Sequence, residues 1–187
     1  MDRAQVCAEI SSSSRFALLP CAGVLDRIRQ AQADADAVVA SPFERGSVPN
    51  SLLAVLDTNV VLDLIYWKDK DCELLEQQLS AGLIRAAASV SCLEELAEVI
   101  SRPAFRLEAS TQIALMEDYV RTALILKNIE PAPCRCRDPD DQKFLDLAFS
   151  AKVQVIFTKD KLVRKAAKKL ARFGIQAFQP SEWTACC

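Results

Sequence analysis

The chain has 187 residues, 51% of them hydrophobic and 26% charged, which suffices for one domain with a buried core. The net charge of −2 excludes neither nucleic acid nor protein partners, and no apolar run reaches the roughly 18 residues of a membrane helix. We therefore expect a cytoplasmic protein without a membrane span. Histidine is absent, which excludes catalytic triads and histidine general bases, so hydrolysis would require carboxylates, a metal ion, Cys or Lys.

Residues 1–50 differ in composition from the rest and are predicted to be an N-terminal extension that is partly helical or disordered. One weak helical stripe can be traced through it, formed by Val24, Ile28, Ala31, Ala35 and Val38. The domain pattern begins abruptly after this extension. One hypothesis is therefore that translation starts near Val48 or Leu52.

The first domain segment begins with an apolar run, 52–56, which is typical of a buried parallel strand and ends at Asp57. A helix is expected to follow to about Trp67, and a second one to be closed by Gly82. Residues 83–89 are predicted to be a short strand. The segment Ser91-Cys92-Leu93-Glu94 matches a capping box, which predicts a helix that carries Glu95 in its first turn and ends before Pro103.

The second half predicts an amphipathic helix over 108–127 and another that starts with Asp138 as N-cap, Pro139 at the first position and Asp141 at the third. Residues 153–158 are predicted to be a β-branched strand that leads directly into Asp160. A basic helix over 161–172 and a last strand over 175–178 follow. This alternation indicates a parallel sheet with helices on both faces.

Positive charge is concentrated in the last third. Residues 134–172 contain 11 Lys and Arg against 5 Asp and Glu, a balance of +6, while the rest balances to −8. Cations beside acidic groups suit a phosphodiester substrate, although a solvated helix face explains the pattern equally well. The residues that we predict to contact RNA are Lys159, Lys161, Arg164, Lys165 and Lys168.

Asp57 and Asp160 each follow an apolar strand, so in a parallel sheet they lie at the same edge. Asp141 at a helix start and Glu95 in a helix's first turn are placed to face that edge as well. Carboxylates this close repel each other unless a cation lies between them. Because oxygen ligands without His or Cys select Mg²⁺ or Mn²⁺, the sequence predicts such a site, with catalysis of phosphodiester hydrolysis by the four acids.

Each acid also has a purely structural interpretation. Asp138 and Asp141 fit helix caps, and for Asp138 we prefer that role, with a supporting position beside the site. Glu94 fits the capping box, which leaves Glu95 as the ligand candidate. Asp160 can serve as N-cap of the basic helix and bind a metal ion at the same time. Asp57 is hardest to explain structurally, since Ser or Thr would cap equally well.

The eight cysteines form only two close pairs, Cys134 with Cys136 and Cys186 with Cys187. Zinc fingers need tight repeated pairs, usually together with His. We predict reduced thiols, some of them buried as small hydrophobic side chains, and keep a zinc or redox site as the weaker alternative.

Together these motifs resemble the PIN-domain nucleases, especially the bacterial group of toxin–antitoxin toxin components (VapC-like). The resemblance covers about residues 52–183, and its motifs are Leu56-Asp57-Thr58-Asn59-Val60, Cys92-Leu93-Glu94-Glu95-Leu96, Cys136-Arg137-Asp138-Pro139-Asp140-Asp141-Gln142-Lys143-Phe144-Leu145 and Phe157-Thr158-Lys159-Asp160.

The resemblance implies a three-layer α/β/α PIN-like fold with a central, mostly parallel sheet in residues 51–187. It implies metal-dependent cleavage of single-stranded RNA, a cognate antitoxin and a homodimer. The acidic ligands that it implies are Asp57, Glu95, Asp141 and Asp160, supported by Thr58, Asn59 and Thr158. A housekeeping RNA-processing nuclease and a non-catalytic RNA-binding module remain alternatives. A haloacid dehalogenase-type phosphatase is disfavoured, since its second Asp would stand where Asn59 is.

Overall fold

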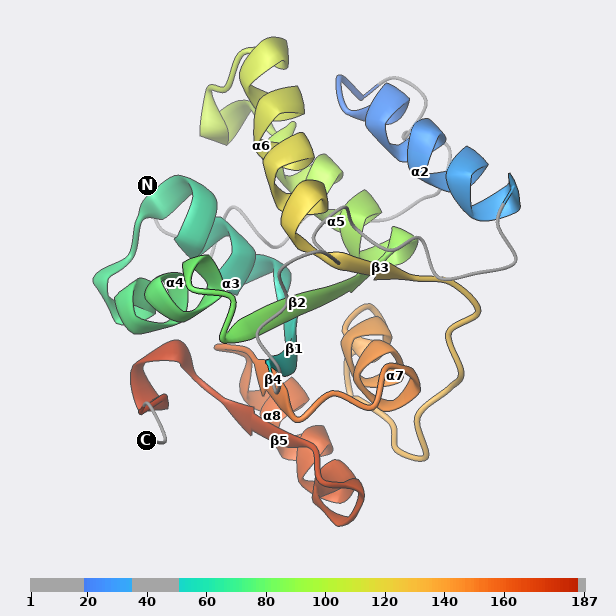
Figure 1. Ribbon diagram of the computed structural model, residues 1–187, viewed down its shortest axis with the longest axis vertical. Coiled ribbons are helices and arrows are strands. Elements are labelled where there is room, and N and C mark those ends of the chain that lie inside the picture. The colour runs from blue at the N-terminus through green and yellow to red at the C-terminus, as the bar shows by residue number, and fades with distance from the viewer. Residues whose placement is uncertain (1–18, 35–50, 185–187) are drawn as a thin grey trace.

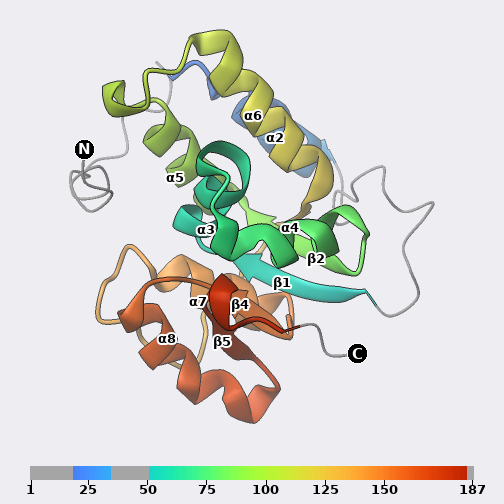
Figure 2. The ribbon, with the colours of Figure 1, turned by 90° about the vertical axis from the view of Figure 1, so that its left-hand side faces the viewer.

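The computed structural model describes residues 19–34 and 51–184, and within them a five-stranded parallel sheet lies between two layers of helices (Figure 1, Figure 2). The strands are β1 Leu52–Leu56, β2 Ile84–Ser89, β3 Leu124–Leu126, β4 Val155–Phe157 and β5 Gln176–Phe178. Their order in the sheet is β3-β2-β1-β4-β5. The predicted three-layer α/β/α fold is confirmed, and every pairing in the sheet is parallel.

Seven α-helices are present in the described residues, and they are α2 Ala22–Asp34, α3 Thr58–Leu62, α4 Glu73–Ser80, α5 Val90–Ile100, α6 Ala109–Thr122, α7 Gln142–Ser150 and α8 Lys161–Ala167. Helix α3 continues as a π-helical turn, Asp63–Trp67, and α8 continues as a 3₁₀ helix, Lys168–Phe173. Gly82 and Gly174 have positive φ angles of 71° and 79° and end α4 and the 3₁₀ helix, as the sequence predicts for Gly82.

The two faces of the sheet bury separate hydrophobic clusters, because successive side chains of a strand point to opposite sides. Ala54 and Leu56 of β1 pack with α2 to α6, whereas Val55 packs with α7 and α8. Strand β4 divides in the same way, with Phe157 on the first face and Ile156 on the second. Both faces are therefore covered, which explains why the strands read as continuous apolar runs.

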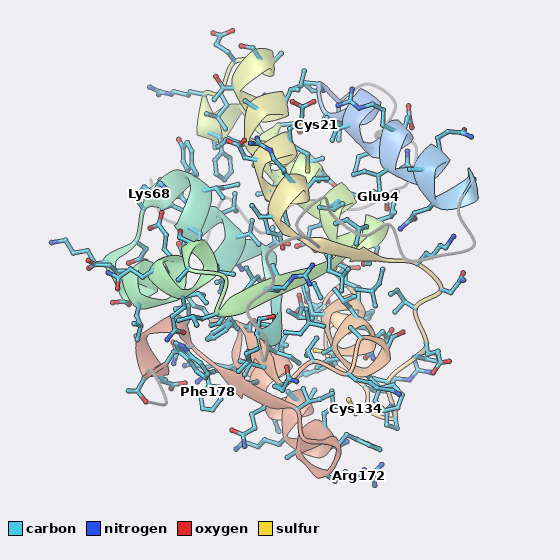
Figure 3. All side chains as sticks on the ribbon, viewed as in Figure 1. Cys21, Lys68, Glu94, Cys134, Arg172 and Phe178 are labelled. Carbon is cyan, nitrogen blue, oxygen red and sulfur yellow. The ribbon has the colours of Figure 1, made fainter. Side chains whose placement is uncertain are left out.

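Helix α2 is an integral part of the larger cluster, although it belongs to the segment predicted as an extension. Its side chains Val24, Leu25 and Ile28 are buried against α5 and α6. An ion pair of 2.5 Å joins Arg29 to Glu94 of α5 at the same contact (Figure 3). Of the predicted helical stripe, Val24 and Ile28 are buried, Ala31 is exposed, and Ala35 and Val38 lie outside the described residues.

Helix α5 begins earlier than predicted. Ser89, the last residue of β2, is its N-cap and accepts a hydrogen bond from the backbone N–H of Cys92 at 3.4 Å. The predicted capping box at 91–94 is therefore wrong, and Glu94 is free to pair with Arg29. Glu95 becomes the sixth residue of α5 and lies in its second turn.

Strand β3 was not expected, because Leu124, Ile125 and Leu126 continue the apolar spacing of the predicted helix over 108–127. In the structure α6 ends at Thr122, and β3 pairs with β2 through the partners Ile125 and Ala88. Pairing to a neighbouring strand overrides local helical periodicity here.

The five cysteines of the described residues are all free thiols, as predicted, and they are Cys21, Cys72, Cys92, Cys134 and Cys136. Four of them are buried. Among residues 19–34 and 51–184, no helix is long and apolar enough to cross a membrane.

Candidate functional site

The carboxyl ends of β1 and β4 lie side by side at the centre of the sheet, where the strand order reverses direction. In open α/β sheets the crevice beside such a reversal is the usual ligand site. Asp57 follows β1, and Thr158, Lys159 and Asp160 follow β4. The sequence prediction that Asp57 and Asp160 share one edge is confirmed by the parallel pairing of β1 with β4.

Asp57 is a buried N-cap, with only 3% of its surface exposed. Its carboxylate accepts a hydrogen bond from the hydroxyl of Thr158 at 2.5 Å and another from the backbone N–H of Asn59 at 3.2 Å. The pKa of Asp57 is raised to about 6, mainly by burial and to a smaller extent by the charges of Glu95 and Asp160, while its two hydrogen bonds act in the opposite direction. A buried acid with this pKa is typical of a functional site.

Asp160 is the N-cap of α8. Its Oδ1 atom accepts hydrogen bonds from the backbone N–H groups of Leu162 at 2.6 Å and Val163 at 2.9 Å. Its own N–H donates to the hydroxyl oxygen of Thr158 at 3.0 Å. Because both capping bonds use Oδ1, capping leaves Oδ2 available for a second ligand.

Helix α7 begins at Gln142 rather than at Pro139 as predicted, which puts Asp141 at the N-cap position, but its side chain makes no capping hydrogen bond. The Asp141 side chain is half-buried. Its pKa is raised to about 7, mainly by burial and in addition by the charges of Asp57, Asp160, Asp138 and Glu95. The acids that the sequence predicts to converge are therefore close enough in the structure to affect one another's pKa values.

Glu95 approaches from α5, on the opposite side from α8. Its Oε2 atom lies 2.7 Å from the ammonium nitrogen of Lys143 on α7. Both side chains are about four-fifths buried, with 21% and 22% of their surfaces exposed. Burial alone would lower the pKa of Lys143, but the adjacent Glu95 carboxylate raises it, so the ammonium group stays charged.

The family model of the PIN domain matches residues 53–162, which is more than half of the chain and includes all four acids. This chain is a member of the PIN domain family. PIN domains are in general nucleases. Searches among curated proteins and among solved structures found no match.

The four residues predicted to support the acids divide into two groups. Thr158 contacts Asp57 directly, Asn59 does so through its backbone N–H, and Thr58 is buried as the first residue of α3. Asp138 instead accepts a hydrogen bond from the N–H of Asp140 at 3.0 Å in an exposed turn. The predicted cap at Asp138 is wrong, because the helix starts four residues later.

Two of the predicted RNA-contacting cations are held in ion pairs. Lys159 lies 2.5 Å from Asp63 and 2.9 Å from Asp69, and Arg164 lies 3.2 Å from Glu182. Lys159 neutralises a carboxylate that is otherwise buried in the π-helical turn, so it stabilises the edge beside the site. Lys161, Lys165 and Lys168 are exposed along α8 and its 3₁₀ extension.

The sequence reasoning missed the partners Lys143, Asp63 and Asp69. For Asp63 a signal exists, since an acid within the apolar stretch 60–65 needs a partner once that stretch is buried. Lys143 carries no such signal, because its partner Glu95 is 48 positions away.

The donor set suits a hard divalent cation. No three Asp, Glu or Cys side chains of the described ranges 19–34 and 51–184 are already arranged to hold a metal ion. Burial is the largest cause of the raised pKa values of Asp57 and Asp141, and the negative charges of the neighbouring carboxylates add to it. A cation between carboxylates relieves this repulsion, and oxygen ligands without His favour Mg²⁺ or Mn²⁺. The residues of this PIN domain therefore fit such an ion.

Proposed function

We propose that this PIN domain is a Mg²⁺- or Mn²⁺-dependent endoribonuclease that cleaves single-stranded RNA in the cytoplasm. The observation that carries the proposal is the mutual influence of Asp57, Asp141 and Asp160, with Glu95 beside them, at the carboxyl edge of the sheet. These four acids are the candidate ligands. A bound divalent ion would supply activation of water and neutralisation of charge on the phosphate.

The chain's own groups have separate roles in this proposal. Thr158 fixes the orientation of the Asp57 carboxylate, and burial of Asp57 keeps bulk water away from it. The exposed Lys161, Lys165 and Lys168 are placed on the helix that Asp160 caps, so an RNA backbone on this helix leads to the acids.

Asp57→Asn tests the proposal. The amide keeps the shape of the side chain and can still accept the hydrogen bond of Thr158, but it removes the negative charge that a cation needs. We expect cleavage of a mixed RNA pool in Mn²⁺ to fall roughly 100-fold or more. Wild-type cleavage should also stop when EDTA is added.

Asp118→Asn is the matched control, because Asp118 is exposed on α6 and pairs only with surface charges. It should cleave as the wild type does, and circular dichroism should show both variants folded. Unchanged turnover in folded Asp57→Asn would contradict the proposal.

We further propose that the protein is the toxin of a toxin–antitoxin pair and forms a homodimer, which rests on the resemblance of its motifs to that bacterial group. Expression should arrest growth, and an antitoxin encoded beside it should relieve the arrest. Expression without growth arrest would favour the housekeeping RNA-processing nuclease, which uses the same chemistry. Light scattering of the purified protein checks the dimer.

A non-catalytic RNA-binding module is the second candidate, and two observations favour it. In the described part of the chain no three acids are preformed as a metal site, and Glu95 is engaged by Lys143. RNA binding without any cleavage in Mn²⁺ would establish that function in place of the nuclease.

A further inference from the structure

Lys143 contacts one acid of the proposed site, Glu95, and unlike Lys161, Lys165 and Lys168 its side chain is mostly buried. It is the second residue of α7, two positions after Asp141, and it reaches across to α5. Its ammonium nitrogen lies 2.7 Å from Oε2 of Glu95, with about a fifth of each side chain exposed. Helices α5 and α7 are thus joined by one charge pair at the edge where Asp57 and Asp160 lie.

Two other cations of this edge are paired with acids outside the candidate ligand set. Lys159 is held by Asp63 and Asp69, and Arg164 by Glu182. Among the ion pairs of residues 19–34 and 51–184, the one that engages a candidate ligand is that of Lys143 with Glu95.

The ion pair of Lys143 with Glu95 changes the net formal charge of the site. The four carboxylates carry −4 when ionised, and Lys143 brings the sum to −3, so one divalent ion leaves −1. Without Lys143 the same four acids could neutralise two divalent ions, which in two-metal sites lie about 3.5–4 Å apart. The ammonium group of Lys143 supplies positive charge to Glu95, as a second cation would.

We propose that Lys143 is a built-in counter-cation and a positioning residue, which holds Glu95 away from the metal so that the site binds one divalent ion through Asp57, Asp141 and Asp160. The inference rests on the proposed function and narrows its ligand set from four acids to three. Glu95 then acts through Lys143, by keeping the ammonium group beside the site.

Counting bound Mn²⁺ by calorimetry and by electron paramagnetic resonance tests this inference without any cleavage assay. The wild type should bind one ion. Lys143→Met should bind a second ion or bind the first roughly tenfold more tightly, because it removes one positive charge. Lys143→Arg keeps the charge and should behave as the wild type. Lys165→Met, which removes an exposed lysine of α8, is the matched control and should change nothing.

The double variant Glu95→Gln/Lys143→Met keeps the sum of −3 and removes the unpaired charge that might prevent Lys143→Met from folding. It should bind one ion with an affinity within a few-fold of the wild type. Loss of Mn²⁺ binding in this variant would make Glu95 a ligand and overturn the inference, as would two ions in the wild type.

The two proposals fail in different ways. If Mn²⁺ binds to the wild type and not to Asp57→Asn, while Lys143→Met matches the wild type in number and affinity, only the inference on Lys143 falls. If Mn²⁺ binds to none of these proteins, the proposed nuclease function falls with it.

Discussion

One hydroxyl group connects the two acidic strand ends. Thr158 donates a hydrogen bond to Oδ2 of Asp57 at 2.5 Å and accepts one from the N–H of Asp160 at 3.0 Å. The Thr158 side chain is completely buried, so water cannot replace either bond. The orientation of both acids therefore depends on a residue that is not itself acidic.

Thr158→Val should weaken both stability and metal binding. Valine has nearly the same shape but leaves an oxygen of Asp57 and the N–H of Asp160 without a partner, which typically costs about 1–3 kcal/mol. Loss of a residue that orients a metal ligand typically lowers metal affinity about 10–100-fold. Urea denaturation in EDTA and titration with Mn²⁺ measure the two effects separately.

Thr158→Ser is the control, because it keeps the hydroxyl and removes only a methyl group. It should retain most of the metal affinity. If the valine and serine variants bind Mn²⁺ equally well, the hydroxyl does not orient Asp57.

At the scale of elements, α2 joins the molecule through side chains rather than through the sheet. Cys21, Val24, Leu25 and Ile28 are buried against α5 and α6, and Lys127 donates a hydrogen bond of 2.7 Å to the carbonyl of Gln32. Figure 3 shows Cys21 at the contact of α2 with α6. No backbone pairing holds α2 in the way that strand pairing holds β1, so α2 is the element expected to open first.

Alkylation of cysteines measures this opening. Burial raises the pKa values of Cys21, Cys72 and Cys92 to about 11, so none should react at pH 8 in the closed state. Cys21 should nevertheless react faster than Cys72 and Cys92, because detachment of α2 exposes it without unfolding the sheet. Leu25→Ala should accelerate the reaction at Cys21, since loss of a buried leucine costs about 2–5 kcal/mol. Peptide mass spectrometry resolves the sites.

Arg27→Ala is the control, because Arg27 is exposed and contributes to the contact with α6 only a surface ion pair to Glu117, which typically stabilises by no more than about 1 kcal/mol. It should leave the reaction at Cys21 nearly unchanged. Equal labelling rates at Cys21 and Cys92 in the wild type would show that α2 unfolds only with the whole domain.

The sequence was most informative where an element is defined by local pattern. The strand before Asp57 and the strand before Asp160 are continuous apolar runs ended by polar residues, and both were predicted at the correct edge. Strand β3 was missed because its apolar spacing continues that of α6, and only pairing with β2 decides its structure. The start of α7 was misplaced because the local signal at Asp138 competes with a turn through Asp140.

The site was predicted less completely than the fold. Acids after strands carry a local signal, whereas Lys143 and Glu95 meet only because α5 and α7 both begin at the same edge of the sheet. The packing of α2 was missed for the same reason, since its partners on α5 and α6 are more than 60 positions away. Contacts between distant elements follow from topology, which a periodic pattern does not encode.

At the scale of the whole molecule, collecting carboxylates at one edge makes stability depend on pH. Asp57 and Asp141 have raised pKa values of about 6 and about 7 in the folded state, compared with 3.8 ordinarily. Between pH 3.8 and about pH 7 the folded state binds more protons than the unfolded state. The free energy of unfolding therefore decreases as pH rises through this range. Below 3.8 both states are protonated, and above about 7 both are ionised, so the stabilising contribution is lost through this window.

We therefore expect metal-free protein in EDTA to lose stability from about pH 4.5 to pH 7.5. For Asp57 alone, the shift from 3.8 to about 6 corresponds to roughly 3 kcal/mol. Because Asp57 and Asp141 interact, their contributions do not add. Mn²⁺ at about 100 times its dissociation constant should restore roughly 2.7 kcal/mol at pH 7.5, since it binds only the folded state.

Asp141→Asn isolates this effect from the other titrating groups, because it removes one of the two raised carboxyl groups and the repulsion that it exerts on Asp57. In EDTA the variant should be more stable than the wild type at pH 7.5 and nearly equal to it at pH 4.5. Urea denaturation at both pH values gives the comparison. A wild-type stability that stays constant or rises over this range would show that the acids are already neutralised, and the electrostatic basis for metal binding at this edge would be lost.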